Sequence, residues 1–308
     1  MRIVTQRQYG DPSVLTVTEV ERPRPGFGQV LVKVGAAGVN QVDLFVRAGA
    51  FPLLTPPFTL GWDVAGTVEE VGPGITQFAP GDAVFGLSAY PAAGDAYAEY
   101  VLADPNDLAR IPDGLSTLRA GALPLAALTA WQALAGVADL RPGQRVLVHR
   151  AAGGVGHLAV QIAKTRGAHV IGTASSAKHA FLKELGADEL IDHTTADYGD
   201  LTGVDVVLDL LGGVHGEKSA RVLRPGGLLV AAVGGNPGFD DSRAAALGVR
   251  FAVVSVRPSA HDLARVAALV AEGRLTVHIE AEFPLAEAAK AHELLASGRV
   301  TGKVVLSP

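Results

Sequence analysis

The alternation of apolar and polar positions divides the chain into two parts. Between residues 2 and 109, short stretches alternate apolar and polar side chains as half-buried strands do, and Pro-Gly or Gly-Asp pairs separate them. The strands expected here are Val14–Val20, Gln29–Val34, Val64–Val71, Ala83–Phe85 and Ala98–Leu102. Short strands at such close spacing predict a compact, partly open barrel.

From Ser116 onward the pattern changes. Residues Ser116–Ala138 are alanine-rich and helical in pattern, with an interruption at Pro124, and strands then alternate with helices. This alternation predicts parallel strands with crossover helices on both faces of the sheet. The expected strands are 146–148, His169–Thr173, Glu189–Ile191, Val204–Leu210, Leu228–Val233, Phe251–Val256 and Val304–Leu306. The expected helices are one after residue 156, Ala177–Leu185, Val214–Leu223, His261–Glu272 and Leu285–Ser297.

The stretch Arg145–Lys164 carries the strongest chemical signal. It reads as a buried strand, a glycine-rich turn and a helix, which is the order of a nucleotide-phosphate cradle. The dinucleotide fingerprint occurs as Ala151-x-Gly153-x-x-Gly156, with alanine where the first glycine is more usual. We expect Gly153 to let the backbone approach a pyrophosphate and Gly156 to let the helix pack closely on the strand. The residues expected to bind cofactor here are Ala152, Gly153, Gly154, Val155 and Gly156. A plain strand-to-helix turn is the alternative.

The next expected strand, which ends at Thr173, indicates the cofactor. An NAD-selective fold places an Asp or Glu at the end of this strand to bind the adenosine ribose. Here no carboxylate follows the strand. The residues at its end are Thr173, two serines (Ser175 and Ser176) and Lys178. Hydroxyl groups and an ammonium would bind a 2′-phosphate, so we predict NADPH over NADH. Alternatively, one serine caps the following helix and Lys178 lies in solvent.

Later strand ends should line the same crevice, because ligands bind at the carboxyl ends of parallel strands. The candidates are Leu211 after one strand and Val233, Gly234 and Gly235 after the next. The two glycines leave room for a nicotinamide ribose.

Composition narrows the function further. The 308 residues include 26 Lys and Arg against 31 Asp and Glu, with no basic stretch, so nucleic acid is not an expected partner. Cysteine is absent, which removes disulfides, thiol nucleophiles and cysteine-ligated zinc. No apolar run reaches the roughly 18 residues of a membrane span, so we expect no membrane association and a cytoplasmic protein.

Several motifs occur together in order along the chain. They are Ala37–Asp43, Leu60–Val68, Pro80–Val84, Tyr97–Val101, Ala127–Ala130, Ala151–Gly156 and Gly302–Leu306. With them the chain resembles the medium-chain dehydrogenase/reductase superfamily and, within it, the zinc-independent quinone oxidoreductase group (zeta-crystallin-like). The resemblance implies an α/β protein: a GroES-like, partly open β-barrel catalytic domain from residues 1–118 and 275–308, and a Rossmann NADP(H)-binding domain with a doubly wound parallel sheet from residues 119–274. It also implies a homodimer, and residues 249–256 are the expected edge strand for pairing.

The departures from the wider superfamily concern the metal. Zinc-dependent members carry Gly-His-Glu where this chain has Gly61-Trp62-Asp63, and a cysteine where it has Asn40. The resemblance therefore implies a reductase with no metal site. The chain also departs from the quinone oxidoreductase group itself, because Phe45 stands at a position where that group often has tyrosine.

By family position, Asn40 is expected to donate a hydrogen bond to the developing substrate oxygen; alternatively it is a loop asparagine that fixes its own backbone. Phe45 and Trp62, with Tyr90, would form a flat apolar wall, unless Trp62 belongs to the core. We expect Thr129 to contact the nicotinamide amide or to cap a helix.

Four further assignments complete the expected site. His193 stands where an aromatic residue commonly flanks the adenine, and Lys303 is expected to reach the cofactor or a backbone carbonyl. Asp43 and Arg47 are expected to form a structural pair. The histidines at 149, 157 and 292 are interpreted as structural.

The leading hypothesis is an NADPH-dependent quinone oxidoreductase acting on a quinone or a similar conjugated carbonyl. Such acceptors are electrophilic without a Lewis acid, unlike simple ketones. Two alternatives stay open: a 2-alkenal or enone double-bond reductase, and a non-catalytic NADPH-binding protein of the same fold.

Overall fold

The computed structural model describes residues 1–233 and 237–308, and the chain divides into two compact units. The first comprises residues 1–128 and 257–308, and the second comprises residues 129–256. The sequence places the domain boundaries after residues 118 and 274, whereas the compact units divide after residues 128 and 256. Helices α2 (Thr117–Gly121) and α8 (Ala260–Ala271) pack on strands of the first unit. The domain assignment itself stays a prediction.

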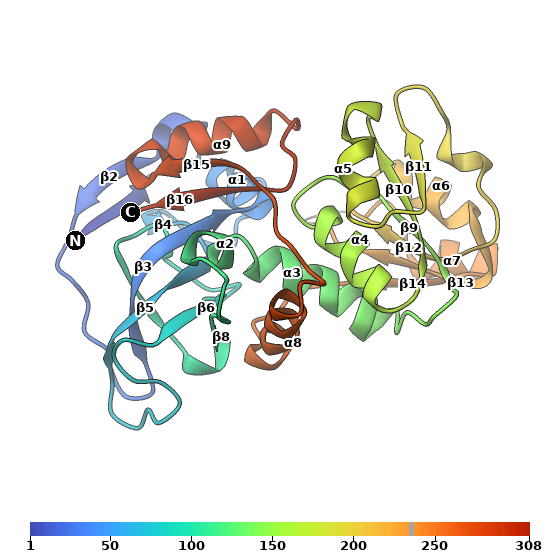
Figure 1. The fold of residues 1–308 in the computed structure, drawn as a ribbon. Coiled ribbons are helices and arrows are strands. Elements are labelled where there is room, and N and C mark those ends of the chain that lie inside the picture. The colour runs from blue at the N-terminus through green and yellow to red at the C-terminus, as the bar shows by residue number, and fades with distance from the viewer. Residues whose placement is uncertain (234–236) are drawn as a thin grey trace. The chain divides into compact units, whose positions relative to one another are not determined.

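The first unit is built from both ends of the chain (Figure 1). Its larger sheet runs β15-β16-β3-β5-β6-β8, with β7 also paired to β3, and a smaller sheet runs β2-β1-β4. The strands are β1 (Arg2–Gln6), β2 (Thr16–Glu19), β3 (Val30–Val39), β4 (Phe58–Thr59), β5 (Asp63–Val71), β6 (Ala83–Leu87), β7 (Tyr100–Ala103), β8 (Leu108–Arg110), β15 (Ile279–Pro284) and β16 (Lys303–Ser307). The remaining helices are α1 (Gln41–Ala48), α3 (Pro124–Trp131), whose last residues belong to the second unit, and α9 (Ala288–Ala296).

One strand pairing in this unit positions the candidate site. The C-terminal strand β16 lies antiparallel to β3, with Val304 opposite Val39 (Figure 1). Residues near the two ends of the chain therefore become neighbours. Because β3 ends at Val39 and α1 begins at Gln41, this pairing places Lys303 beside the start of a helix.

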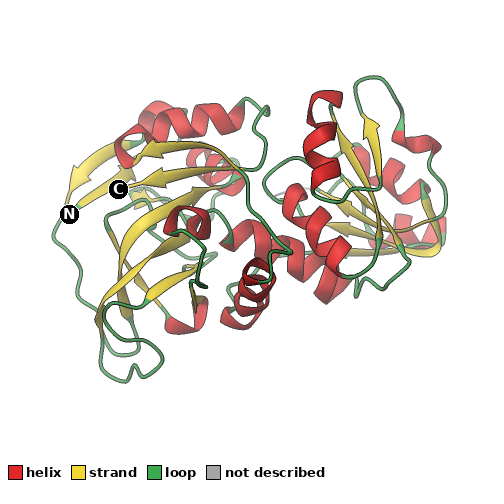
Figure 2. Ribbon diagram, in the orientation of Figure 1, coloured by secondary structure: helices red, strands yellow, loops and turns green. Residues whose placement is uncertain are grey.

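The second unit has the expected strand–helix alternation (Figure 2). Its described strands form a parallel six-stranded sheet in the order β11-β10-β9-β12-β13-β14, which is the doubly wound order of dinucleotide-binding folds. The strands are β9 (Arg145–Val148), β10 (His169–Ala174), β11 (Glu189–Asp192), β12 (Val204–Asp209), β13 (Leu223–Ala231) and β14 (Arg250–Val253). The helices are α4 (Gly156–Thr165), α5 (His179–Glu184), α6 (His215–Arg221) and α7 (Asp241–Leu247), with a π-helical segment at Gln132–Val137 and a 3₁₀ turn at Ser176–Lys178. Helices cover both faces of this sheet (Figure 1).

Burial explains why these strands are apolar throughout rather than alternating. Leu147, Ile171, Val207 and Leu229, on four neighbouring strands, share one buried cluster, and the residue before each of them, which faces the other side of the sheet, is buried as well. Each fully buried side chain of this size contributes about 1.5–3 kcal/mol relative to an exposed one.

Several helices and strands differ from those predicted from the sequence, in existence or in their end residues. The helices α1 and α7 and the strands β1 and β4 were not anticipated. The strand expected at Val14–Val20 is shorter, because Asp11 and Pro12 start a 3₁₀ turn over Pro12–Val14. The helix expected over Ser116–Ala138 is divided between α2, α3 and the π-helical segment.

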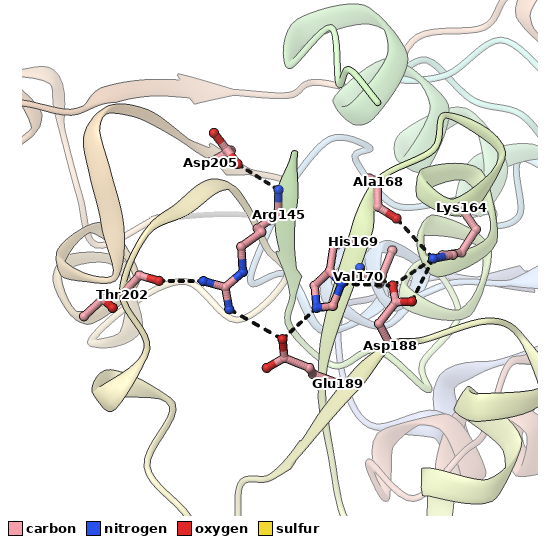
Figure 3. Close-up of polar contacts among 9 residues, drawn as sticks. All are labelled: Arg145, Lys164, Ala168, His169, Val170, Asp188, Glu189, Thr202 and Asp205. Atoms are coloured by element: carbon pink, nitrogen blue, oxygen red, sulfur yellow. Dashed lines mark hydrogen bonds and ion pairs between the residues drawn. The ribbon is translucent and has the colours of Figure 1, made fainter. Parts of the chain in front are cut away.

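A polar network joins the amino ends of three neighbouring strands (Figure 3). Glu189, the first residue of β11, contacts Arg145 of β9 at 3.5 Å and His169 of β10 at 2.6 Å. Asp188 accepts from Lys164 at 2.8 Å and from the Val170 N–H at 2.7 Å. The network lies at the sheet edge opposite the glycine-rich turn, and partly exposed pairs of this kind contribute about 0–1 kcal/mol each. It links β9, β10 and β11 at this edge of the sheet.

Candidate functional site

The turn between β9 and α4 has the geometry of a phosphate cradle. The Gly153 N–H donates to Arg150 O at 2.8 Å, and α4 begins at Gly156. A Cβ on Gly156 would lie 2.2 Å from Arg150 O and 2.7 Å from Ala151 Cα, so only glycine fits there. A Cβ on Gly153 would lie 3.2 Å from Arg150 O. The residues present fit a dinucleotide pyrophosphate, which the positive end of α4 would favour.

Two buried residues hold this turn in place. The Ala151 N–H donates to Thr173 O at 3.0 Å, and the Thr173 hydroxyl accepts from the Arg150 N–H at 3.3 Å. The same hydroxyl lies 3.2 Å from His149 Nδ1. The Thr173 side chain therefore supports the turn from inside the protein, and its contact with the cofactor stays a prediction.

The loop after β10 combines the predicted polar residues with a carboxylate that sequence reasoning missed. Ser175 precedes the turn Ser176–Lys178, without a side-chain capping bond. The capping alternative is therefore wrong for Ser175. Asp192, the last residue of β11, accepts from the Ser176 N–H at 3.0 Å. The end of β10 itself carries no carboxylate, as predicted. The neighbouring strand β11, however, places the Asp192 carboxylate beside it.

The remaining cofactor candidates lie at carboxyl ends of strands. His193 follows β11 and is exposed, and the Leu211 N–H, after β12, donates to Asp209 Oδ1 at 2.8 Å. Val233 follows β13. Gly234 and Gly235 lie outside the described residues.

In the first unit, Asn40 lies directly before α1 at the centre of a buried polar cluster. Its amide nitrogen donates to Asp63 Oδ2 at 2.8 Å, and its amide oxygen accepts from the Lys303 ammonium. Lys303 is 2% exposed, donates to Val39 O at 3.1 Å and lies 3.4 Å from Asp63 Oδ2. Lys303 thus reaches a backbone carbonyl, and its expected contact with the cofactor stays a prediction.

Asp63 is the counter-charge of this cluster. Burial raises the pKa of its carboxyl, and the Lys303 charge and the Asn40 amide oppose that rise. The Leu125 N–H donates to its other oxygen at 2.6 Å. The signal for Asp63 was present in the sequence, at the position of the glutamate of zinc-dependent members, but it was not used.

The predicted Asp43–Arg47 pair does not form. Among the described residues, Arg47 makes no hydrogen bond to Asp43; its guanidinium donates to Gly10 O at 3.1 Å and contacts His292 Nδ1 at 3.3 Å. Asp43 instead accepts from the Asn40 N–H at 2.7 Å. Four residues apart on α1, the two side chains find separate partners.

Asp43 gives a pH-dependent prediction. Burial raises the pKa of its carboxyl from 3.8 to about 7. Between pH 3.8 and about pH 7 the carboxyl is ionised in the unfolded chain but still protonated in the folded chain. The free energy of unfolding therefore falls as pH rises through this range, and the full loss is reached above pH 7. Asp43→Asn keeps an acceptor for the Asn40 N–H. Its stability relative to wild type should rise with pH by about 1.4 kcal/mol per unit over this window.

Urea denaturation of both proteins at pH 5, 6 and 8 measures this difference. A stability difference that is constant across the three pH values would contradict the assignment.

The aromatic wall expected of Phe45, Trp62 and Tyr90 does not include Trp62, and for Phe45 it stays a prediction. Trp62 is 0% exposed, its Nε1–H donates to Ala92 O at 2.6 Å, and its ring meets Tyr90 edge-on at 5.4 Å. This is the core alternative, and we correct the assignment of Trp62 to the wall. Phe45 is half-buried on α1.

Two other expectations are resolved by burial and position. Thr129 lies inside α3, so helix capping is wrong for it, and its nicotinamide contact stays a prediction. The histidines at 149, 157 and 292 are all buried and have polar partners, which confirms their structural interpretation. Burial lowers the pKa of His149 and of His292 to about 3.

Membrane and family comparisons complete the description. No helix in the described part of the chain is long and apolar enough to span a bilayer. Residues 26–113 match the family described as alcohol dehydrogenase GroES-like domain, and residues 185–306 match the family described as zinc-binding dehydrogenase.

Among curated relatives, the mouse (Mus musculus) quinone oxidoreductase is 34% identical over 99% of this chain and 97% of its own length. The 2-haloacrylate reductase of a Burkholderia species is 35% identical over 97% of this chain and 96% of its own length. Polyketide synthase GfsB of Streptomyces halstedii is 39% identical over 91% of this chain, but the chain spans only 5% of that protein.

Solved structures agree in fold. The quinone oxidoreductase of Coxiella burnetii matches with a TM-score of 0.93 and 37% identity, covering 100% of this chain and 99% of that one. The Escherichia coli quinone oxidoreductase complexed with NADPH matches with a TM-score of 0.92 and 28% identity, covering 100% of both chains. These matches confirm a GroES-like domain joined to a Rossmann-type parallel sheet and support a nicotinamide cofactor. The chain therefore belongs to the quinone oxidoreductase group of the medium-chain dehydrogenase/reductase superfamily.

Proposed function

We propose that this protein is an NADPH-dependent quinone oxidoreductase that delivers hydride to a quinone or a similar conjugated carbonyl without zinc. The observation that carries the proposal is the buried cluster of Asn40, Lys303 and Asp63. It occupies the region in which zinc-dependent relatives place metal-binding side chains. An amide, an ammonium and a single carboxylate are not a zinc-binding donor set.

The cluster orients the Asn40 amide. Lys303 contacts the amide oxygen and Asp63 accepts from the nitrogen, so the two ends of the amide are distinguished by charge. The nitrogen also lies 3.5 Å from Gly38 O, which is the outer limit of a hydrogen bond. In this proposal the second proton of the nitrogen serves a substrate oxygen, and one such donor contributes about 3 kcal/mol in a transition state.

The cofactor's part of the proposal rests on the second unit. NADPH, when bound, supplies the hydride. The β9–α4 turn, with Gly153 and Gly156, would hold its pyrophosphate. Ser176 and Lys178 would face the 2′-phosphate, since a hydroxyl and an ammonium suit that group.

A double-bond reductase is the second candidate, because the Burkholderia 2-haloacrylate reductase is a full-length relative. A conjugated alkene next to a carbonyl needs the same orientation and the same donor to its oxygen. We further propose a cytoplasmic homodimer that pairs through the edge strand β14, where Val253 is exposed.

A substrate panel tests the function. Loss of NADPH absorbance is followed with 1,4-benzoquinone, 9,10-phenanthrenequinone, an enal, an enone and 2-chloroacrylate. We expect the two quinones to have the highest kcat/KM, and Asn40→Ala to lower it by about two orders of magnitude, which corresponds to one lost donor. Preference for the alkenes would favour the second candidate, and NADPH binding without turnover of any acceptor would indicate the non-catalytic alternative.

A further inference from the structure

The structure brings a carboxylate to the adenosine end of the cofactor cradle. Asp192, the last residue of β11, lies opposite Ala174, the last residue of β10, in the parallel pairing of the two strands. The loop that starts after Ala174 carries the serines and the lysine assigned to the ribose. In NAD-selective folds, the acidic residue that hydrogen-bonds the ribose 2′-hydroxyl lies at the end of the strand corresponding to β10. Here a neighbouring strand supplies one.

Asp192 is held by uncharged donors of Ser176 and Thr194, the Ser176 hydroxyl among them. One oxygen accepts from the Ser176 N–H at 3.0 Å. The other accepts from the Thr194 N–H at 2.9 Å and from the Thr194 hydroxyl at 2.6 Å. These bonds, the hydroxyl of Thr194 first among them, hold the pKa of the carboxyl far below its ordinary value. The Asp192 carboxyl therefore carries a negative charge at neutral pH.

We propose that Asp192 is a specificity-determining residue that limits the preference for NADPH, so that NADH serves as a second cofactor. The inference rests on the proposed function, in which the loop after β10 holds the adenosine ribose. The carboxylate is one hydrogen bond from that loop, occupies the Ser176 N–H that a phosphate would otherwise use, and repels the phosphate charge. The same oxygens are acceptors that suit a free ribose 2′-hydroxyl.

Binding measurements test this without turnover. Dissociation constants of NADPH and NADH are measured by fluorescence titration, and those of adenosine 2′,5′-bisphosphate and AMP by calorimetry. In Asp192→Asn the ratio of the NADH constant to the NADPH constant should rise about five- to tenfold, as expected for removing one nearby, partly screened charge. The bisphosphate-to-AMP comparison should change in the same direction.

Three control variants isolate the charge. Thr194→Ala removes a bond to Asp192 but keeps its charge, so the ratio should stay unchanged. Asp197→Asn removes a similar capping carboxylate, which accepts from the Gly199 N–H at 2.8 Å and is paired with Lys218. It should also leave the ratio unchanged. Ser176→Ala combined with Lys178→Ala should weaken NADPH alone.

The possible outcomes distinguish a failure of the proposed role of Asp192 from a failure of the proposed oxidoreductase function. An unchanged ratio in Asp192→Asn, or equal weakening of both dinucleotides, would overturn the role of Asp192 and leave the oxidoreductase proposal standing. If wild-type protein bound neither dinucleotide nor either adenosine probe, the proposed function itself would fall.

Discussion

Lys303→Met is expected to lower the free energy of unfolding by about 3–5 kcal/mol, because it leaves a buried carboxylate without its cation. Asp63 is 0% exposed, and the Lys303 ammonium is 3.4 Å from it. The change also removes the donor to the Asn40 oxygen, so the amide loses the contact that orients it. We expect kcat/KM for the preferred acceptor to fall about 10- to 100-fold in protein that remains folded.

Urea denaturation and steady-state kinetics measure the two effects. Lys290→Met removes a lysine from an exposed pair with Glu287 and should cost less than about 1 kcal/mol. Should Lys303→Met fail to fold, the double variant Lys303→Met with Asp63→Asn removes both charges and should recover a large part of the lost stability. A loss below about 1 kcal/mol, or no recovery in the double variant, would show that the buried pair is not coupled.

Gly156→Ala is expected to weaken NADPH binding by about two orders of magnitude and to destabilise the second unit by about 1–3 kcal/mol. The added Cβ would lie 2.2 Å from Arg150 O, so the start of α4 must move away from the turn. Because the turn and the helix start hold the pyrophosphate together, a displacement between them removes the alignment of their N–H groups.

Matched glycines provide the comparison. Gly136 lies in the same unit, and a Cβ added to it would have nothing within 4 Å. Gly136→Ala should therefore change neither NADPH binding nor the stability of the second unit appreciably. Gly153→Ala meets only Arg150 O, at 3.2 Å. It should weaken NADPH binding with a smaller loss of stability, because its contact with the fold is less close than that of Gly156 and its Cβ would lie where the proposed pyrophosphate approaches the backbone. Equal behaviour of all three variants in fluorescence titration and thermal melting would refute this account of the turn.

The local pattern of the chain was enough to predict much of its architecture. Continuous apolar strands, Pro and Gly positions and the Ala151–Gly156 turn predicted a parallel sheet with its phosphate cradle, and the shared motifs predicted the family. Helix α1 escaped detection because it buries Asp43 and Arg47. Charged residues on the buried face of a helix conceal the periodicity that sequence reasoning depends on.

What only the tertiary structure decided is which polar groups meet. Lys303 reaches Asn40 because β16 pairs with β3, and Asp192 reaches Ser176 because β11 pairs with β10. Trp62 lies in the core because the surrounding fold buries it completely, and the distant Ala92 carbonyl accepts its N–H. Helix and strand periodicity and turn geometry are set by neighbouring residues, and so they can be read along the chain. Strand register and burial bring together residues far apart in sequence, and those contacts determine the charge, orientation and exposure of each candidate side chain.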